Sequence, residues 1–352
     1  MTNPHAMFFE QMFSRLDIAT DFISNYLPEN VVKLLDISSL ELERKSFINK
    51  QLQGMQSDIL YKIKTIDGIP LWIYVLLEHK SYIDRWVLFQ VLGYIVQIGD
   101  HERMINKAKR KQEKHRNRSK NNNTEIEFLT PVIPIIVYHG PKKWDIPAHL
   151  SQIYQNIGPF KPYIPDFKFE VVDLRQYTDA QIKGTVYLRV IFLVMKYYFS
   201  NYEDHKLSKI LSLLTDLIQQ RSTIDFLCVL FEYIGTNNSC DESFIKSNIQ
   251  ESFQEKGDKI MYSMADKYKD IGRMEGRMEG KMEGKMEGRN EALTRMLDIL
   301  FIERFGTFPT KIKNQLNQID NVKIEDLTRA ALKFNSLNDY DQWWDNYFSA
   351  KH

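Results

Sequence analysis

The sequence predicts an α/β fold with a mixed central sheet flanked by helices. Residues 57–80 hold two runs of β-forming residues on either side of Asp67-Gly68, which is a tight-turn signal. Pro131–Tyr138 and Lys168–Leu174 are two further strand-like runs. Between the first and second of these regions, Ser81–His101 has the wide apolar face of a buried helix. Strands that alternate with helices are typical of α/β proteins.

The flanking sequence is mostly helical in pattern. A helix is expected from Pro4 and a second over Asp21–Tyr26, with the first strand lying within Leu35–Ile48. Residues from Ala180 to about Ser247 carry helical apolar faces and predict a support or cap. The predicted organisation is a core at 1–175, a helical support or cap region at 176–270, a repeat at 271–290 and a small helical domain at 291–352.

Composition indicates a globular protein without a disulfide framework. The 352 residues are 43% apolar and have a formal net charge of +1, so overall charge gives no sign of a nucleic-acid partner. Cys228 and Cys240 are too few for a disulfide framework and are expected to be buried thiols. The most apolar late run, Val186–Phe199, contains Arg189 and Lys196 and is too short to span a bilayer. With no signal-peptide pattern, the expected location is the cytoplasm.

The hairpin places two carboxylates where chemistry is expected. Asp58 lies ten residues before Gly68 and Glu78 ten residues after it. In an antiparallel pair these positions meet at the open end of the hairpin. Glu78 and Lys80 are two apart and share one face of their strand.

This grouping suits metal-assisted hydrolysis. Asp58, Glu78 and the His79 carbonyl are hard oxygen ligands for Mg²⁺, and Lys80 would assist the attacking water. The alternative is a surface hairpin with ordinary solvated charges at its ends. Spacing alone does not decide between the two.

Several blocks resemble a known family. The hairpin has the pattern D-(x)19-E-x-K, which resembles the PD-(D/E)xK nuclease superfamily, and the chain is similar to the Rpn family of recombination-promoting nucleases and YhgA-like transposases. The matching blocks are PHAMFFEQMFS at Pro4–Ser14, FISNYLP at Phe22–Pro28, LELERKSFI at Leu40–Ile48, SDILYKIK at Ser57–Lys64, IYVLLEHKS at Ile73–Ser81 and PVIPIIVYHG at Pro131–Gly140.

The resemblance implies a function. It implies a metal-dependent DNA endonuclease that uses Mg²⁺, or another divalent cation such as Mn²⁺ or Ca²⁺, and that promotes recombination or belongs to a mobile element. Two positions depart from the family pattern: Ala6 stands where members usually have an acid, and Lys80 stands where they often have glutamine. The second alternative is a non-catalytic DNA-binding or oligomerising protein that keeps the nuclease scaffold.

Gln90 and a basic segment are further candidates. Gln90 and Tyr94 are four apart on the predicted helix, and such a pair resembles one found in some nucleases of the superfamily. A buried structural glutamine is the alternative. The segment 107–120 has eight Lys/Arg and one acid, and is expected to be a loop beside the site that either follows a phosphate backbone or is only solvated. The proposed DNA contacts are Lys107, Lys109, Arg110, Lys111, Lys114, Arg116 and Arg118.

Residues 273–289 form a repeat of period four, RMEG-RMEG-KMEG-KMEG-R. As a helix, it has like-signed charges at every i,i+4 pair and interior glycines that each cost about 1 kcal/mol relative to alanine. It is expected to be a linker or a helix completed by a partner. Helices follow near 293–300, 309–319 and 324–334, and the region is expected to mediate self-association into a homo-oligomer or regulation.

Overall fold

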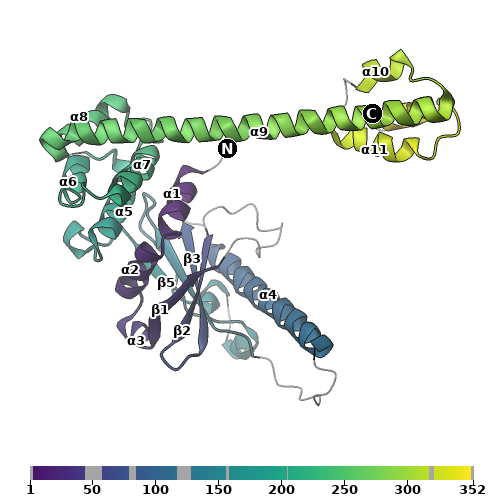
Figure 1. Cartoon of the computed structure of the whole chain (residues 1–352). Coiled ribbons are helices and arrows are strands. Elements are labelled where there is room, and N and C mark those ends of the chain that lie inside the picture. Colours follow the sequence, from purple (N-terminus) through teal and green to yellow (C-terminus); the bar gives the residue numbers. More distant parts are fainter. Residues whose placement is uncertain are drawn as a thin grey trace. The chain divides into compact units, whose positions relative to one another are not determined.

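The computed structural model describes residues 3–43, 58–78, 85–116, 128–155, 158–203, 205–316 and 321–349. The chain divides into two compact units, residues 1–264 and 265–352. The first unit holds the sheet and most of the helices (Figure 1). Within the described residues, no helix combines the length and the apolar character needed to cross a membrane.

The described strands form one mixed sheet in the order β1-β2-β3-β4-β5. The pairs β1/β2 and β2/β3 are antiparallel, and β3/β4 and β4/β5 are parallel. β3 and β4 run in the same direction because the chain returns through α4 between them. The bounds are β1 Leu35–Leu42, β2 Asp58–Thr65, β3 Pro70–Glu78, β4 Val132–Tyr138 and β5 Glu170–Asp173. The mixed α/β class predicted from sequence is confirmed.

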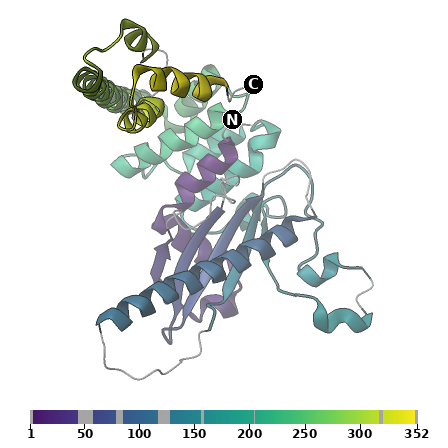
Figure 2. The same ribbon diagram turned by 90° about the vertical axis from the view of Figure 1, so that its right-hand side faces the viewer.

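Helices cover both faces of the sheet, as Figures 1 and 2 show. Alternate strand residues such as Tyr61, Ile73 and Val137 share one core cluster with α1 (Pro4–Phe13), α2 (Leu16–Tyr26) and α5 (Val186–Tyr197). The other alternate set packs against α4 (Val87–Arg116). This alternation is the period-two pattern of a sheet that is buried on both faces.

The first helix is held at both ends. Asn3 caps α1 by accepting a hydrogen bond of 3.0 Å from the His5 amide, and Pro4 occupies the first turn. At the other end, the buried Tyr61 hydroxyl donates to the Phe13 carbonyl at 2.5 Å and ties the helix to β2. The chain then turns, and the second helix begins at Leu16, five residues before the start at Asp21 that the sequence predicted.

The remaining α-helices of the first unit pack on the α1 side. α7 contacts α1, and the ring of Phe8 stacks on the ring of Tyr233 with centroids 4.1 Å apart. The bounds are α3 Glu29–Val32, α6 Lys206–Ser212, α7 Arg221–Gly235 and α8 Glu242–Phe253, and the short 3₁₀ helices are η3 Leu150–Ile153, η4 Gly158–Tyr163, η5 Asp179–Gln181, η6 Tyr198–Ser200 and η7 Gln254–Lys256.

The long helix α9 (Gly257–Phe305) begins in the first unit and continues into the second. The repeat at residues 273–289 is therefore helical. In the second unit, α9 packs with α10 (Thr310–Leu316), α11 (Asn321–Ala331) and α12 (Leu337–Ser349) around the buried Phe301. Trp343 and Trp344 pack partly buried against this small core.

Candidate active site at the carboxyl end of the sheet

The hairpin register places Asp58 and Glu78 at the same end of the sheet. Asp58 pairs with Leu76, and Glu78 lies two residues farther along β3. Lys64 and Pro70 form the last pair before the turn, so the register is centred on Asp67 and not on Gly68. The two acids are therefore diagonal neighbours rather than directly opposed. Such positions have Cα atoms about 7–8 Å apart and lie on the same face.

That face is the one covered by α4. Tyr74 on β3 and its neighbours Ile136 and Tyr138 on β4 belong to the core cluster that contains α4. Because residues two apart on a strand lie on one face, register positions 58, 76 and 78 fall on the same face as these three. The candidate acids and α4 therefore occupy one side of the sheet.

The start of α4 lies near these acids. Tyr94 packs its ring against Tyr74 at a centroid distance of 5.0 Å. Gln90 precedes Tyr94 by one helical turn and so lies about 6 Å nearer the carboxyl end of β3. Gln90 is therefore roughly level with the paired positions Leu76 and Asp58. Gln90 is half-buried at the margin of the packed face. The structure therefore brings Gln90 to the end of the sheet where the sequence placed the site.

Three predicted site residues, His79, Lys80 and Arg118, lie outside the described residues. For Asp58 and Glu78 the backbone positions are described by the strand register. Among the described residues there is no group of three or more His, Cys, Asp or Glu side chains arranged to hold a metal ion. The evidence for a metal site is therefore the register of the two acidic positions.

The ends of β4 and β5 extend the same edge. Glu78 pairs with Tyr138, and Tyr138 pairs with Asp173, so three neighbouring parallel strands end level with one another. His139 follows β4 and is buried, with its ring centroid 4.9 Å from that of His5 on α1. His5 Nδ1 lies 2.8 Å from the Tyr233 hydroxyl. The amino end of α1 thus reaches the carboxyl end of β4, where His5 is packed among aromatic rings.

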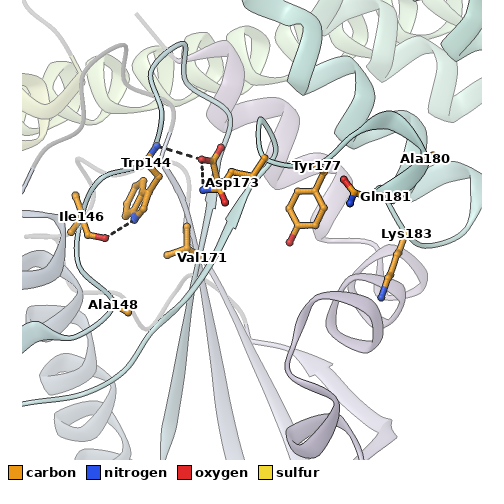
Figure 3. A pocket seen from close by; sticks show the side chains of 10 residues that line it. Trp144, Ile146, Ala148, Val171, Asp173, Tyr177, Ala180, Gln181 and Lys183 are labelled. Carbon is orange, nitrogen blue, oxygen red and sulfur yellow. Dashed lines mark hydrogen bonds between the residues drawn. The ribbon is translucent and has the colours of Figure 1, made fainter.

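A pocket opens beside the end of β5 (Figure 3). Its volume of about 810 Å³ is within the range of small-ligand sites. The buried Asp173 carboxylate accepts hydrogen bonds from the Trp144 amide at 3.4 Å, the Arg175 amide at 3.1 Å and the Gln176 side chain at 3.0 Å. The lining residues are Trp144, Ile146, Ala148, Val171, Asp173, Gln176, Tyr177, Ala180, Gln181 and Lys183.

Tyr177 brings a neutral phenol to this pocket. Burial raises the pKa of Tyr177, and the negative charge of Asp173 raises it further. The phenol therefore stays protonated at neutral pH and remains a hydrogen-bond donor. Asp173 and Glu78 lie on strands separated only by β4, which corresponds to about 10 Å. The pocket and the candidate acids are accordingly close enough to contact one extended ligand.

The basic segment does not lie beside these acids. Lys107 to Arg116 continue α4, so the expectation of a loop is wrong for these residues. Lys107 is about 30 Å along the helix from Val87. Glu102 accepts hydrogen bonds from the amide and hydroxyl of Thr130, just before β4 begins, and so fixes this part of α4 at the amino end of β4. The basic residues follow, at the opposite end of the sheet from Asp58 and Glu78.

Sequence reasoning did not assign Asp173 or His139 to the site. Asp173 was included in the strand-like run Lys168–Leu174, and His139 follows the run Pro131–Tyr138 without a role assigned to it. The usable signal was that each stands at the carboxyl end of an apolar strand run, where ligands gather in sheets with parallel strands.

The chain is similar to several known proteins. Residues 3–225 match the family described as "Putative transposase, YhgA-like". The chain is 29% identical over 199 residues to recombination-promoting nuclease RpnD of Escherichia coli O157:H7, which covers 56% of this chain and 68% of the relative. It is 30% identical over 139 residues to recombination-promoting nuclease RpnA of Escherichia coli K12, covering 40% of this chain and 41% of that protein.

One similar protein carries a name that denies activity. The inactive recombination-promoting nuclease-like protein RpnE of Escherichia coli K12 is 25% identical over 245 residues, covering 66% of this chain and 70% of the relative. No solved structure matches the chain significantly. Because the family match spans well over half of the residues, including the whole sheet and α4, the chain belongs to the YhgA-like transposase family.

Proposed function

We propose that this protein is a metal-dependent DNA endonuclease that hydrolyses phosphodiester bonds and promotes recombination, or serves a mobile element. The observation that carries the proposal is the strand register, which puts Asp58 and Glu78 on one face at the carboxyl end of the sheet. The order of these residues is that of the nuclease pattern D-(x)19-E-x-K. Relatives named recombination-promoting nucleases support the reaction class.

Asp58, Glu78 and the His79 carbonyl would hold the metal, with Mg²⁺ as the first choice and Mn²⁺ or Ca²⁺ as alternatives. All three offer hard oxygen ligands, which Mg²⁺ prefers. When bound, the metal would polarise a phosphate and lower the pKa of a bound water.

The protein groups have separate roles in this proposal. Lys80 orients the attacking water and offsets negative charge that develops on the phosphoryl oxygens. Gln90 reaches the same face from the first turns of α4 and holds the water or the substrate by its amide. The Asp173 pocket lies two strands from Glu78 and receives a part of the DNA next to the cleaved bond.

The DNA follows α4 in this proposal. Trp86 and Phe89, at the start of the helix, are 70% and 57% exposed and lie at the end of the sheet with the acids. Aromatic rings in such positions can stack on unpaired bases. The basic residues of α4 begin at Lys107, about 30 Å along the helix and close to one turn of duplex DNA, and continue to Arg116, about 44 Å along it. They would contact phosphates from about one turn beyond the cut, through Lys107, Lys109, Arg110, Lys111, Lys114 and Arg116. Arg118, the remaining proposed contact, lies outside the described residues.

A second function has its own support. The protein would bind DNA or oligomerise without cutting, keeping the nuclease scaffold. RpnE is named inactive, and so is YjiP of Escherichia coli K12, which is 35% identical over 97 residues covering 93% of that protein. Ala6 departs from the usual acidic residue and is buried in α1.

Plasmid cleavage distinguishes the two functions. The purified protein is incubated with supercoiled plasmid and Mg²⁺, Mn²⁺, Ca²⁺ or EDTA, beside Asp58→Asn, Glu78→Gln and Lys80→Ala. We expect metal-dependent cutting that each substitution lowers by more than about a hundredfold, because each removes a group that acts on the reacting phosphate.

The matched control is Asp67→Asn, which changes an exposed acid at the turn of the same hairpin and should leave cutting unchanged. Cutting that survives Asp58→Asn would contradict the assigned site. Absence of cutting with every metal, combined with salt-dependent binding of the plasmid in a gel-shift assay, would establish the binding function instead.

A further inference from the structure

The Asp173 carboxylate lines the pocket beside β5 and is only 3% exposed. The hydrogen bonds that the structure describes to it all come from neutral amides: the backbones of Trp144 and Arg175 and the side chain of Gln176. A buried carboxylate is costly unless hydrogen-bond donors satisfy its oxygens, which together accept about four bonds. Asp173 therefore has room for a further donor from a ligand.

One of the three donors can be displaced. Trp144 and Arg175 donate from the backbone, whereas the Gln176 side chain is exposed and lines the pocket. The Gln176 amide reaches Asp173 Oδ2 at 3.0 Å. When a ligand takes its place, each carboxylate oxygen keeps one backbone donor and has one open position. Two neighbouring N–H groups of a planar ligand match this arrangement.

The other side of the pocket offers hydrogen-bond donors (Figure 3). The Gln181 side-chain oxygen accepts a hydrogen bond of 2.8 Å from the Thr178 amide, which fixes the orientation of Gln181 and leaves its NH₂ group as a donor. Tyr177 keeps its phenolic proton at neutral pH, because burial raises its pKa. Lys183 adds an exposed cation, and the Tyr26 hydroxyl holds the Lys183 backbone in place.

The remaining walls are apolar. Trp144 and Ile146 are buried in the core cluster on the α4 face, and Val171 packs against the same cluster. The Trp144 indole N–H donates to the Ile146 carbonyl at 3.1 Å and so fixes the segment that carries both residues. The pocket thus combines apolar walls with an acceptor at one edge and donors at another, which suits a flat heterocycle.

A carboxylate distinguishes among the four DNA bases. Guanine alone carries two N–H donors side by side, at N1 and at its N2 amino group. Adenine and cytosine each have a ring nitrogen acceptor beside the amino group, and thymine has a single N–H between two carbonyl oxygens. Base pairing covers this edge in duplex DNA, so a protein reads it on a base that has left the stack. The acceptor in this pocket therefore favours an unpaired guanine.

The pocket lies on the same face of the sheet as the candidate acids. Asp173 and Glu78 both pair with Tyr138 on the strand between them, and residues paired on neighbouring strands point to one face. Their separation of about 10 Å corresponds to about three nucleotides along one strand of DNA. A single strand can therefore reach both.

We propose that the Asp173 pocket binds an unpaired guanine of the DNA strand. Guanine N1–H and the N2 amino group donate to the Asp173 carboxylate, and O6 faces the donors of Tyr177 and Gln181. Lys183 meets a phosphate of the same strand. This inference rests on the proposed nuclease function, because the position of the pocket beside the candidate acids makes DNA the source of the base. It predicts a guanine close to the cleaved bond.

Base preference is the first test, measured in EDTA so that no strand is cut. Fluorescence anisotropy compares the affinity of the full chain for labelled thymidine octamers in which one central base is guanine, adenine, cytosine or hypoxanthine. The guanine strand should bind at least about tenfold more tightly than the adenine, cytosine and all-thymine strands. Hypoxanthine, which lacks the N2 amino group, should fall between. Equal affinity for all strands would overturn the proposal.

Free dGMP separates the two sources of guanine. It should displace the labelled guanine octamer only at concentrations at least about tenfold above those of unlabelled octamer, because dGMP makes no phosphate contacts beyond the pocket. Equal potency would assign the pocket to a free nucleotide and overturn DNA as its ligand.

The sharpest variant is Asp173→Asn, which replaces one acceptor oxygen by an NH₂ group that meets a guanine N–H. It should lower the affinity for the guanine strand at least about tenfold and leave the affinity for the all-thymine strand unchanged. Asp173 also anchors the Trp144 amide, so a second variant leaves it intact. Ala180→Trp fills the pocket from an exposed position and should remove the guanine preference in the same way.

The matched control is Ala265→Trp, at an exposed alanine of α9 that does not line the pocket, and it should bind as the natural chain does. A guanine preference that survives both pocket variants would overturn the proposal. Plasmid cleavage separates this inference from the proposed function. Metal-dependent cutting without a guanine preference would overturn the guanine site alone. A guanine preference that both pocket variants remove, without cutting by any metal, would support the site and overturn the endonuclease.

Discussion

The packed helical layers of the first unit and the repeat of α9 are both helical, for different physical reasons. In the first unit, α4 buries Leu88 and Val91 against the sheet, and α5 buries almost its whole length. In α9, Ile260 belongs to the core of the first unit and Phe301 to that of the second, while the repeat between them buries nothing that the structure describes. Helical structure in the layers thus follows from tertiary packing, whereas the repeat is helical although its described side chains gain no such burial.

The largest expected contrast comes from removing one apolar side chain in each region. Leu88→Ala should lower the free energy of unfolding by about 2–5 kcal/mol, because Leu88 is fully buried and the change leaves a cavity. Met278→Ala should change the stability of the first unit by less than about 0.5 kcal/mol, because Met278 is exposed. Urea unfolding followed by tryptophan fluorescence measures both. Equal losses of unfolding free energy in Leu88→Ala and Met278→Ala would contradict the difference in burial between the two regions.

A glycine-to-alanine substitution should act in opposite directions in the two regions. Gly184 has φ +110°, and an added Cβ would lie 2.7 Å from Leu188 Cδ2 and 2.8 Å from Asp21 Oδ2. The Asp21 carboxylate accepts hydrogen bonds from the amide and hydroxyl of Thr185 at the start of α5. It cannot move away from the added Cβ without breaking them. Gly184→Ala should therefore destabilise the first unit by about 1–3 kcal/mol.

Gly280→Ala is the matched substitution in the repeat. Its added Cβ meets open space inside a helix, so helicity should rise, with a gain of about 1 kcal/mol. Circular dichroism at 222 nm and urea unfolding test the pair of variants. Loss of helicity in Gly280→Ala would contradict the open space beside this glycine.

Much of the hairpin was predictable because its signals are local. The alternation of Ile59, Tyr61 and Ile63 and the Asp67-Gly68 turn predict two paired strands at the observed places. The register was wrong by two residues, because the turn residues do not show where pairing stops. Lys64 and Pro70 still pair, and the Thr65 amide donates to the Ile69 carbonyl. The prediction that both acidic positions meet at the open end of the hairpin agrees with the observed register.

Other features depend on information that is not local. The basic segment was expected to be a loop beside the site, but lysine and arginine are also good helix formers, and α4 continues through Arg116. Its distance from Asp58 follows from the direction of α4 across the sheet, which no residue pattern encodes. Helix α12 was missed although its apolar residues Leu337, Tyr340 and Trp344 recur at helical spacing. Asp173 required knowledge of which strand lies beside β4.

The smallest expected effect concerns charge. Burial raises the pKa of Asp179, but hydrogen bonds from Lys196 and Tyr197, at 2.7 and 2.6 Å, outweigh burial and hold that pKa below its ordinary value. A lowered folded-state pKa gives stability that is present above the unfolded pKa of 3.8 and is lost as pH falls through the folded value. Asp179→Asn should therefore cost below about 1 kcal/mol at pH 7.

The difference between Asp179→Asn and the natural chain should shrink as the pH falls from 3.8 through the lower folded-state pKa of Asp179, because below that pKa both chains carry an uncharged group at this position. Urea unfolding at a series of pH values measures this difference. A constant difference at all pH values would show that the ion pairs between Asp179 and the lysines of α5 and α6 contribute nothing through charge. This would weaken the contrast with the interior of the repeat, where no opposite charges are three or four residues apart. The two terminal arginines differ, because Arg273 pairs with Asp270 and Arg289 with Glu325 of α11.

The period of the repeat also has a geometric consequence. One added repeat would insert one full set of glycine, basic, methionine and acidic positions. It would shift the later part of α9 by about 6 Å along the helix axis and rotate it by about 40°. Because the side chains of the repeat are exposed, such an insertion meets no core residue. A variant with one repeat more or one repeat fewer should therefore keep the cores around Ile260 and Phe301 intact.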